Sequence, residues 1–359
     1  MRKLLIDDKI RIFAVKYKNT VNNECDSVIE DLETLKDVVL ESHPWKNKDG
    51  IRDYFDKFIS EYPDLLALEP EKWDIGGYDD LVKDDPDFLS QIIEFKKNTK
   101  GSKRRIYEKI MECLQYSKIR KILGEIHMEM GLKTCVYCNS QAAECGAGKL
   151  FYQLDHFMPQ SKYPYLGTCF YNLQPSDSSC NVRKSNKLCN FHLYVNSKEA
   201  PLSPFKLQVN ILNDVPINKD NFTINLIGNT GIETKQSKEY NEMFHIDDKY
   251  LSHRQKAATF YKKALRLNES NQKALREALG DFQTQNEFIE EWLEMSLDER
   301  FIHEEPFRKL KYDFLNDLLD NIIYKISSPK LSVIINIVPI TISSNLPFSV
   351  VMVCRTCRA

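Results

Sequence analysis

The sequence predicts an α+β protein that is mainly helical, with a strand-strand-helix unit near the middle of the chain and a short β-hairpin after it. Apolar residues recur at helical spacing over residues 1–90 and 235–324. Short β-branched or alternating runs indicate strands at 150–155, 168–173, 205–212 and 222–227. The composition agrees, because 28% charged and 42% hydrophobic residues over 359 positions are typical of a globular protein of one or two domains.

The N-terminal region, residues 1–130, is expected to be a helical scaffold that ends in one long basic helix. This helix should span residues 103–130, and Gly131 should end it, because glycine accepts the left-handed conformation of a C-cap. A basic cluster lies mostly on its polar faces: Lys96, Lys97, Lys100, Lys103, Arg104, Arg105, Lys109, Lys118, Arg120 and Lys121. Two interpretations stay open, a solvated helix face and a surface that contacts phosphates. The formal net charge of -2 means that attraction to nucleic acid must come from such a local patch.

The strand-strand-helix unit follows the basic helix. A strand at 150–155 is expected to pair with an antiparallel strand at 168–173. A helix should then span 179–187. Ser176 or Asp177 is the expected N-cap, since both side chains can accept hydrogen bonds from the first amides of a helix.

The polar residues of this unit resemble the motif of the HNH, or ββα-metal, nuclease family. The matching residues, in chain order, are Cys135, Cys138, Asp155, His156, Asn172, Asn181 and Lys184. The resemblance implies an HNH nuclease domain over residues 131–200. It also implies that Asp155 and Asn181 bind Mg²⁺ or Mn²⁺ and that His156 is the general base. Asn172 would orient the loop that carries the base.

These implied roles suit the chemistry of the residue types. Carboxylate and amide oxygens are hard ligands that Mg²⁺ and Mn²⁺ accept. An imidazole with an ordinary pKa of about 6.5 can accept a proton near neutral pH. A side-chain amide can donate to a loop backbone and accept from it at once. Lys184 lies one helical turn after Asn181 and is expected to contact a phosphate, with Arg183 and Lys187 as further contacts.

A structural zinc ion is a further expectation from the same resemblance. The family completes the Cys135-x-x-Cys138 half-site with Cys-x-x-Cys-Asn, but here Asp177 replaces the first of those cysteines. The expected ligands are therefore Cys135, Cys138, Cys180 and Asp177. Other candidates for the fourth position are Cys145, Cys169, Cys189, His192 and the tail pair Cys354 and Cys357. The alternative without zinc is that the cysteines pack as small apolar groups.

The remaining chain divides into residues 201–328, with the hairpin and further helices, and an apolar tail, 329–359. Residues 331–353 form an uncharged run that is long enough to cross a bilayer. Pro339 and Pro347 interrupt this run, so two packed strands are the favoured interpretation and no membrane is expected. The absence of a cleavable signal peptide and of a regular cysteine framework predicts a cytoplasmic protein.

The function that the resemblance implies is a metal-dependent HNH endonuclease that hydrolyses phosphodiester bonds in DNA. The flanking regions resemble, more weakly, bacterial HNH proteins of restriction and phage-defence loci. These include the HNH subunit of Septu-type systems, which implies an ATPase partner. Two other hypotheses stay open: an RNA-cleaving, toxin-like nuclease with the same site, and a nucleic-acid-binding module that no longer cleaves. No residue of the motif senses a 2′-hydroxyl, and the intact motif favours an enzyme.

Overall fold

The structure is a computed structural model. It describes residues 1–95, 102–146, 149–198, 200–211, 219–266, 273–274, 277 and 285–327. Helices and small sheets are mixed through these residues, which confirms the α+β class. The strands in the described ranges pair only two by two, in five separate two-stranded sheets. Most of the buried core is therefore supplied by helices.

Residues 1–90 fold into helices, as the sequence predicts. They are α1 (Asp8–Glu24), α2 (Val28–Ser42), α3 (Lys48–Leu65) and α4 (Ile75–Leu81), with 3₁₀ turns η1 (Pro70–Lys72) and η2 (Phe88–Ser90). Polar side chains begin two of these helices. Asp7 accepts a hydrogen bond from the amide of Ile10, and Asn47 accepts one from the amide of Gly50, both at 2.9 Å. Helices α2 and α3 then pack against each other.

The prediction of one long helix over residues 103–130 is wrong. This stretch forms β3 (Ser102–Arg105), which pairs with β2 (Ile92–Phe95), then α5 (Ile106–Cys113) and α6 (Tyr116–Glu129). The helix is interrupted at Gln115, whose φ of 52° is left-handed. The interruption lets two apolar stripes face different neighbours, because α5 packs on α2 whereas α6 packs on α1. Gly131 does follow α6 with a φ of 76°, as expected of a C-cap glycine.

The basic cluster is also divided by this arrangement. Lys96, Lys97 and Lys100 lie outside the described residues. Lys109 is not on a polar face: it is buried, and its ammonium lies 2.9 Å from a carboxylate oxygen of Glu112. The cluster is therefore not one continuous helical surface.

Two antiparallel strands and a helix follow in the predicted order. They are β6 (Gln153–His156), β7 (Leu173–Ser176) and α7 (Ser178–Lys184), with Asp155 opposite Gln174. We call them the β6–β7–α7 unit. The second strand begins later than expected, because the preceding residues form the 3₁₀ turn η4 (Phe170–Asn172). The amide of Phe170 donates to the carbonyl of Leu66 at 2.9 Å, so the N-terminal helices hold this segment instead of a strand partner.

Helix α7 has the N-cap that the sequence allowed. Asp177 accepts hydrogen bonds from the amides of Ser179 and Cys180 at 2.9 and 3.0 Å. The helix ends at Lys184 and not at Lys187, because Ser185 has a φ of 49° and leaves the helical conformation. The short helix carries residues of two different sites, which are described below.

The predicted hairpin is confirmed, and so is the helical character of the chain after it wherever residues 235–324 are described; residues 267–272, 275–276 and 278–284 lie outside the described residues. Strands β9 (Phe205–Ile211) and β10 (Phe222–Gly228) pair antiparallel, with alternate side chains buried. The later helices are α8 (Gly231–Phe244), α9 (Ile246–Leu251), α10 (Arg254–Leu265), α12 (Gln285–Leu293), the 3₁₀ turn η6 (Glu299–Glu304) and α13 (Arg308–Ser327). Helices α8, α9 and α10 contact β10, whereas α13 contacts β9. The hairpin is thus covered by helices from its own half of the chain.

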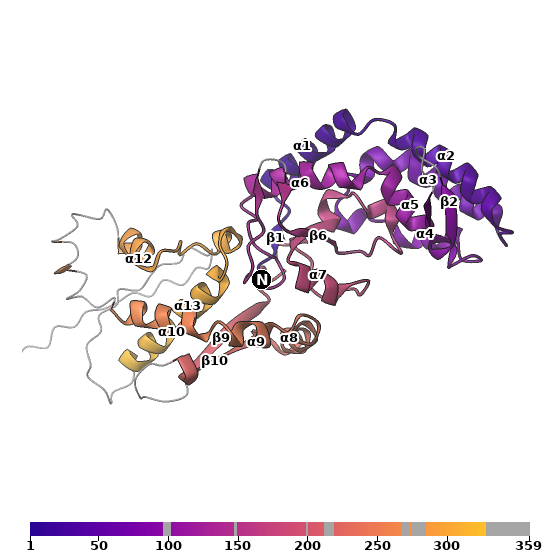
Figure 1. Cartoon of the computed structure of the whole chain (residues 1–359). Coiled ribbons are helices and arrows are strands. Elements are labelled where there is room, and N and C mark those ends of the chain that lie inside the picture. The colour runs from indigo at the N-terminus through magenta and orange to yellow at the C-terminus, as the bar shows by residue number, and fades with distance from the viewer. Residues whose placement is uncertain are drawn as a thin grey trace, which may run out of the picture.

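The β6–β7–α7 unit lies between the N-terminal helices and the hairpin with its helices (Figure 1). Asn139 holds the neighbouring segment to the C-terminal part, since its side chain donates to the carbonyl of Ile302 at 2.9 Å and accepts from the amide of Lys309 at 2.8 Å. Two further small pairs complete the sheets: β1 (Leu4–Leu5) with β8 (Tyr194–Val195), and β4 (Cys145–Gly146) with β5 (Lys149–Leu150).

The predictions for the C-terminal tail fall on residues that the structure does not describe. The two strands expected within residues 331–353, and the pair Cys354 and Cys357, belong to this part of the sequence. Among the residues that are described, no helix combines the length and the apolar character needed to cross a membrane.

Candidate functional site

A polar cleft of about 340 Å³ opens beside the β6–β7–α7 unit. Three residues that the sequence marks as acting together line it: Asp155 and His156 from β6, and Asn181 from α7. Tyr116 and Arg120 of α6 also line it. The fold therefore brings a carboxylate, an imidazole, an amide and a guanidinium to one cavity.

Asp155 is held from two sides within the protein. The hydroxyl of Tyr137 donates to Oδ2 at 2.5 Å, and the Lys184 ammonium lies 3.1 Å from Oδ2 and 3.3 Å from Oδ1. Burial raises the pKa of Asp155, while the charge of Lys184 and the hydrogen bond from Tyr137 oppose this rise. The two partners fix the orientation of the carboxylate at the edge of the cleft.

His156 is oriented by a backbone carbonyl. Its Nε2 lies 2.9 Å from the carbonyl oxygen of Gly167. A carbonyl oxygen can only accept, so Nε2 carries the proton and Nδ1 is the nitrogen with the lone pair. Burial lowers the pKa of His156 to about 4, so the ring is neutral at pH 7. A Cβ at position 167 would lie 2.8 Å from the backbone carbonyl oxygen of Pro164, so glycine is needed for this close approach.

Asn172 makes the hydrogen bonds that its expected role requires. Its side-chain oxygen accepts from the amide of Met158 at 2.7 Å. Its side-chain nitrogen donates to the carbonyls of Met158 and Leu166, at 3.2 and 2.9 Å. Asn172 is fully buried and closes the loop between the two strands. The amide therefore holds the loop that also presents the carbonyl partner of His156.

Asn181 faces the cleft from the first turns of α7. Its side-chain nitrogen donates to Oε1 of Gln153, so Oδ1 is the atom left to bind a cation. Asn181 and Asp155 thus offer two hard oxygens to one cleft, a donor set that suits Mg²⁺ or Mn²⁺. Two protein ligands also leave coordination positions for water and phosphate.

The expected phosphate contact of Lys184 is corrected by the structure. Its side chain has no exposed surface, and its ammonium donates to the carbonyl of His156 at 2.6 Å as well as pairing with Asp155. Lys184 points inward because it is the counter-ion of a buried carboxylate, and it does not line the cleft. Arg183, in the last turn of α7, and Lys187, three residues after the end of the helix, are exposed.

Arg120 is a cleft residue that the motif does not mark. One of its terminal nitrogens donates to the carbonyl of Tyr152 at 3.4 Å, while its Nε is buried with no hydrogen-bond partner among the described residues. Arg120 lines the cleft, and a guanidinium in this place is suited to a phosphate oxygen. The only sequence signal for this residue was its membership of the basic cluster.

Tyr137 is the other residue that the motif does not mark. It lies between Cys135 and Cys138, is fully buried, and stacks on Phe244 with ring centroids 4.6 Å apart. Its hydroxyl donates to Asp155 and accepts from the side chain of Gln174 at 3.1 Å. Tyr137 therefore joins the cysteine pair to the carboxylate of the cleft.

The expected metal ligands Cys135, Cys138, Asp177 and Cys180 form one cluster. Their ligand atoms all lie within 4.8 Å of one another, so the group could hold a metal ion. The pKa of the Cys138 thiol is lowered well below its usual value by hydrogen bonds with Cys135 and then Cys180. Asp177 uses one carboxylate oxygen as the cap of α7 and directs the other to the sulfur of Cys138, at 3.2 Å.

A lysine balances the negative charge of this cysteine cluster. The ammonium of Lys249 lies 2.9 Å from the sulfur of Cys180 and 3.6 Å from a carboxylate oxygen of Asp177. A cation in this place stabilises thiolates, which are the forms that bind metals. Lys249 belongs to α9, so the helices after the hairpin complete the surroundings of the cluster.

The alternative fourth ligands have other places in the fold. His192 hydrogen-bonds the carbonyl of Tyr171 at 2.8 Å, and the thiol of Cys169 donates to the carbonyl of Leu68 at 3.5 Å. Cys145 lies in β4, and Cys189 is buried outside the cluster. Asp177 is therefore the residue that the structure brings to the three cysteines.

The cleft and the cysteine cluster are both formed by residues of this one chain. Both sites share α7, and Tyr137 connects them through Asp155. Comparisons with protein-family models, curated proteins and solved structures found no match.

Proposed function

We propose that the protein is a metal-dependent endonuclease of the HNH type that hydrolyses phosphodiester bonds in DNA. The observation that carries this proposal is the convergence of Asp155, His156 and Asn181 on one polar cleft. Together they have the chemistry that hydrolysis of a phosphodiester requires. Asp155 and Asn181 offer two oxygen ligands for a cation, and His156 offers a neutral base. The pairing of these side chains with supporting residues favours a catalytic site over a chance grouping.

His156 would act as the general base through Nδ1. Its Nε2–H keeps donating to the carbonyl of Gly167, which also stabilises the positive charge that the ring acquires when Nδ1 takes a proton from water. Asn172 keeps this loop in place during the reaction. Because the ring is neutral at pH 7, it is ready to accept a proton without prior deprotonation.

Asp155 and Asn181 would hold Mg²⁺ or Mn²⁺ at the edge of the cleft. When bound, such an ion stabilises negative charge on the reacting phosphate. Arg120, which also lines the cleft, would bind a phosphate oxygen, and the exposed Arg183 and Lys187 would contact the neighbouring nucleic-acid backbone. Lys184 would keep the Asp155 carboxylate ionised and would hold its orientation from inside the protein.

The cysteine cluster would bind a structural Zn²⁺. Three sulfur ligands and one carboxylate oxygen can complete a tetrahedral site, and the burial of the cluster is typical of closed structural sites. The ion would tie the segment of Cys135 and Cys138 to the first turn of α7. The site would therefore support the cleft without taking part in the reaction.

The weaker resemblance of the flanking regions supports a role in bacterial restriction or anti-phage defence. In that setting the protein would work in the cytoplasm with an ATPase partner. Co-purification of the chain with an ATPase encoded beside it tests this part of the proposal. Recovery of the chain alone, under conditions that preserve cleavage, would count against it.

Cleavage of a supercoiled plasmid and of transfer RNA, with Mg²⁺, Mn²⁺ or a chelator, tests the central proposal. We expect metal-dependent cleavage of DNA, and a loss of about 100-fold or more in His156→Ala and Asn181→Ala. His245→Ala, which changes a histidine outside the cleft, should cleave like the parent. Cleavage that persists in His156→Ala would show that another group is the base. Cleavage of RNA in place of DNA would change the substrate but keep the site.

A further inference from the structure

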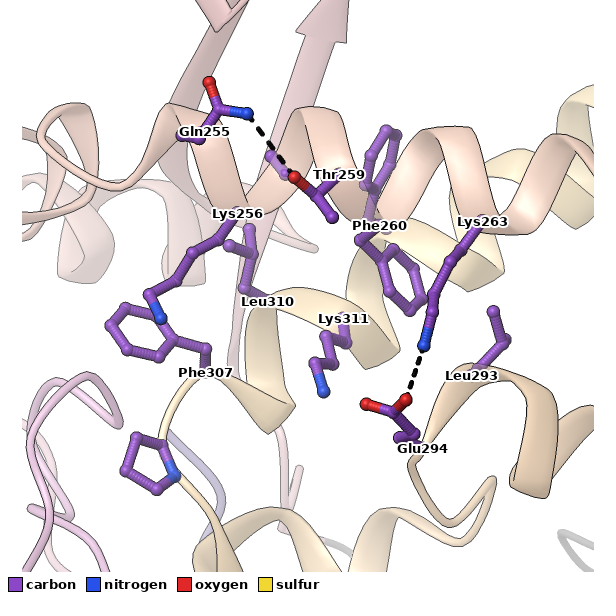
Figure 2. A pocket seen from close by; sticks show the side chains of 13 residues that line it. Gln255, Lys256, Thr259, Phe260, Lys263, Leu293, Glu294, Phe307, Leu310 and Lys311 are labelled. Atoms are coloured by element: carbon purple, nitrogen blue, oxygen red, sulfur yellow. Dashed lines mark hydrogen bonds and ion pairs between the residues drawn. The ribbon is translucent and has the colours of Figure 1, made fainter.

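A second pocket, of about 320 Å³, lies in the C-terminal part of the chain between α10, the end of α12 and the start of α13 (Figure 2). It shares no residue with the cleft beside Asp155. Its floor is apolar and includes Phe260, Leu293, Leu310 and Phe314. A cavity of this volume can enclose a small organic ligand.

Three lysines line this pocket, together with one glutamate. Lys263 is already paired, with its ammonium 2.8 Å from a carboxylate oxygen of Glu294. The ammonium of Lys256 lies 4.4 Å from the centroid of the Phe307 ring. In the view of Figure 2, the Lys311 side chain lies between these two pairs. The walls therefore carry an excess of positive charge over an apolar floor.

Lys311 has the least complete surroundings of the three lysines. Its side chain is half-buried, and within the described ranges no carboxylate lies within ion-pair distance of its ammonium. Burial lowers the pKa of Lys311, because the charged form loses water, and Glu305 and Glu294 oppose this only from farther away. An anion bound in the pocket would supply the missing partner.

Two residues that line the pocket have a left-handed backbone conformation, which residues other than glycine rarely adopt. Glu294 has a φ of 53° and Phe307 a φ of 66°. The amide of Phe307 donates to the carbonyl of Asn139 at 2.6 Å, so a distant part of the chain imposes this conformation. The pocket is therefore formed before any ligand arrives, and strain of this kind is often found at binding sites.

We propose that this pocket binds a nucleotide, with the phosphate between Lys256 and Lys311 and the base against the apolar floor. A phosphate with two negative charges matches two ammonium groups, whereas a carboxylate needs only one. A planar base can stack on the aromatic side chains of the floor. Gln255 and Thr259 at the rim add polar groups for the base edge. The site is distinct from the hydrolytic cleft, and its ligand is either a free nucleotide or the 5′-phosphorylated terminal nucleotide of a strand.

Isothermal titration calorimetry on the full-length His156→Ala protein tests this proposal, and the chelator EDTA in the buffer keeps an added strand from metal-dependent cleavage during the measurement. The ligands are AMP, GMP, CMP and UMP, a 5′-phosphorylated single-stranded oligonucleotide, inorganic phosphate and laurate. We expect at least one nucleoside monophosphate to bind about tenfold or more tightly than phosphate or laurate. Binding by the oligonucleotide that is lost with Lys311→Gln would identify a strand as the source.

Two variants and a matched control decide the outcome. Lys311→Gln and Lys256→Gln should each weaken nucleotide binding about tenfold or more, because each removes a charged hydrogen bond. Lys262 is an exposed lysine on the same helix as Lys256, α10, and does not line the pocket, so Lys262→Gln should bind like the parent. No binding of any nucleotide overturns the proposal, as does equal binding by all three variants or tighter binding of laurate. Cleavage is not measured here, so this failure is distinguishable from failure of the proposed nuclease.

Discussion

The cysteine cluster and the polar cleft, two groups of possible metal ligands, meet at one short helix, α7. Cys180 and Asn181 are neighbours in α7, yet the first faces a buried cluster and the second an open cleft. The cluster offers three sulfurs and one carboxylate oxygen, whereas the cleft offers two oxygens beside an imidazole. Soft ligands in a closed set are suited to structure, and hard ligands with open positions are suited to chemistry. The comparison shows how one turn of helix can serve both.

Tyr137 is the physical connection between the two sites. Its backbone lies between the cysteines of the cluster, and its hydroxyl reaches Asp155 in the cleft. A change in the cluster can therefore reach the cleft through the side chain of Tyr137. The sulfur of Cys138 instead hydrogen-bonds to Asp177 and Ser140, and Asn181 in the cleft donates to Gln153. The predictions below separate the two sites in order of decreasing effect.

Breaking the cluster should have the largest effect on stability. In Cys138→Ala we expect the bound zinc to be lost and the free energy of unfolding to fall by more than about 5 kcal/mol, because metal binding and folding are coupled. Urea unfolding and elemental analysis measure the two quantities. Cys145→Ala, which removes a thiol outside the cluster, should retain the zinc. An unfolding curve for Cys138→Ala that matches the parent would show that the cluster is not a structural centre.

Removing the buried counter-ion of Asp155 should have the next largest effect. Lys184→Met leaves a buried carboxylate without its cation, which should cost about 3–5 kcal/mol of unfolding free energy. Lys187→Met, at an exposed lysine three positions later, should change stability by no more than about 0.5 kcal/mol. Guanidinium unfolding of the two variants checks this difference. Equal stabilities would mean that Lys184 is not the partner that holds Asp155.

Removing the connection should affect the cleft more than the cluster. In Tyr137→Phe we expect a loss of about 1.5–3 kcal/mol in stability and slower plasmid cleavage, with the zinc content unchanged. Tyr240→Phe is the matched control, because its buried hydroxyl donates to the carbonyl of Tyr137 at 2.7 Å and does not reach Asp155. If both variants slow cleavage equally, the effect is general destabilisation and not the orientation of Asp155.

The smallest effect concerns a buried histidine outside both sites. Burial lowers the pKa of His127 from 6.5 to about 3, so the unfolded chain takes up a proton between these pH values while the folded protein does not. Its contribution to stability is therefore complete above pH 6.5 and is lost as the pH falls. At pH 5 the loss should be about 2 kcal/mol, and His127→Phe should lack it. Urea unfolding at pH 7 and pH 5 measures this, and equal pH dependence in both proteins would contradict it.

The sequence predicted the helical regions and the hairpin well, because apolar periodicity reports directly which face of an element is buried. It predicted the order of strands and helix in the β6–β7–α7 unit but misplaced the second strand. It also missed the break at Gln115. Both errors have one cause, since hydrogen bonds and packing partners from distant helices decided the local conformation at these points.

For the sites, the sequence by itself determined the kinds of ligand and their order along the chain. The resemblance to the HNH motif was enough to name Asp155, His156 and Asn181 and to place Asp177 with the three cysteines. Only the tertiary structure decided that Lys184 turns inward, that Tyr137 joins the two sites, and that three lysines of the C-terminal helices gather over an apolar floor. The physical reason is that these contacts join residues far apart in the chain, so they exist only once the helices have packed.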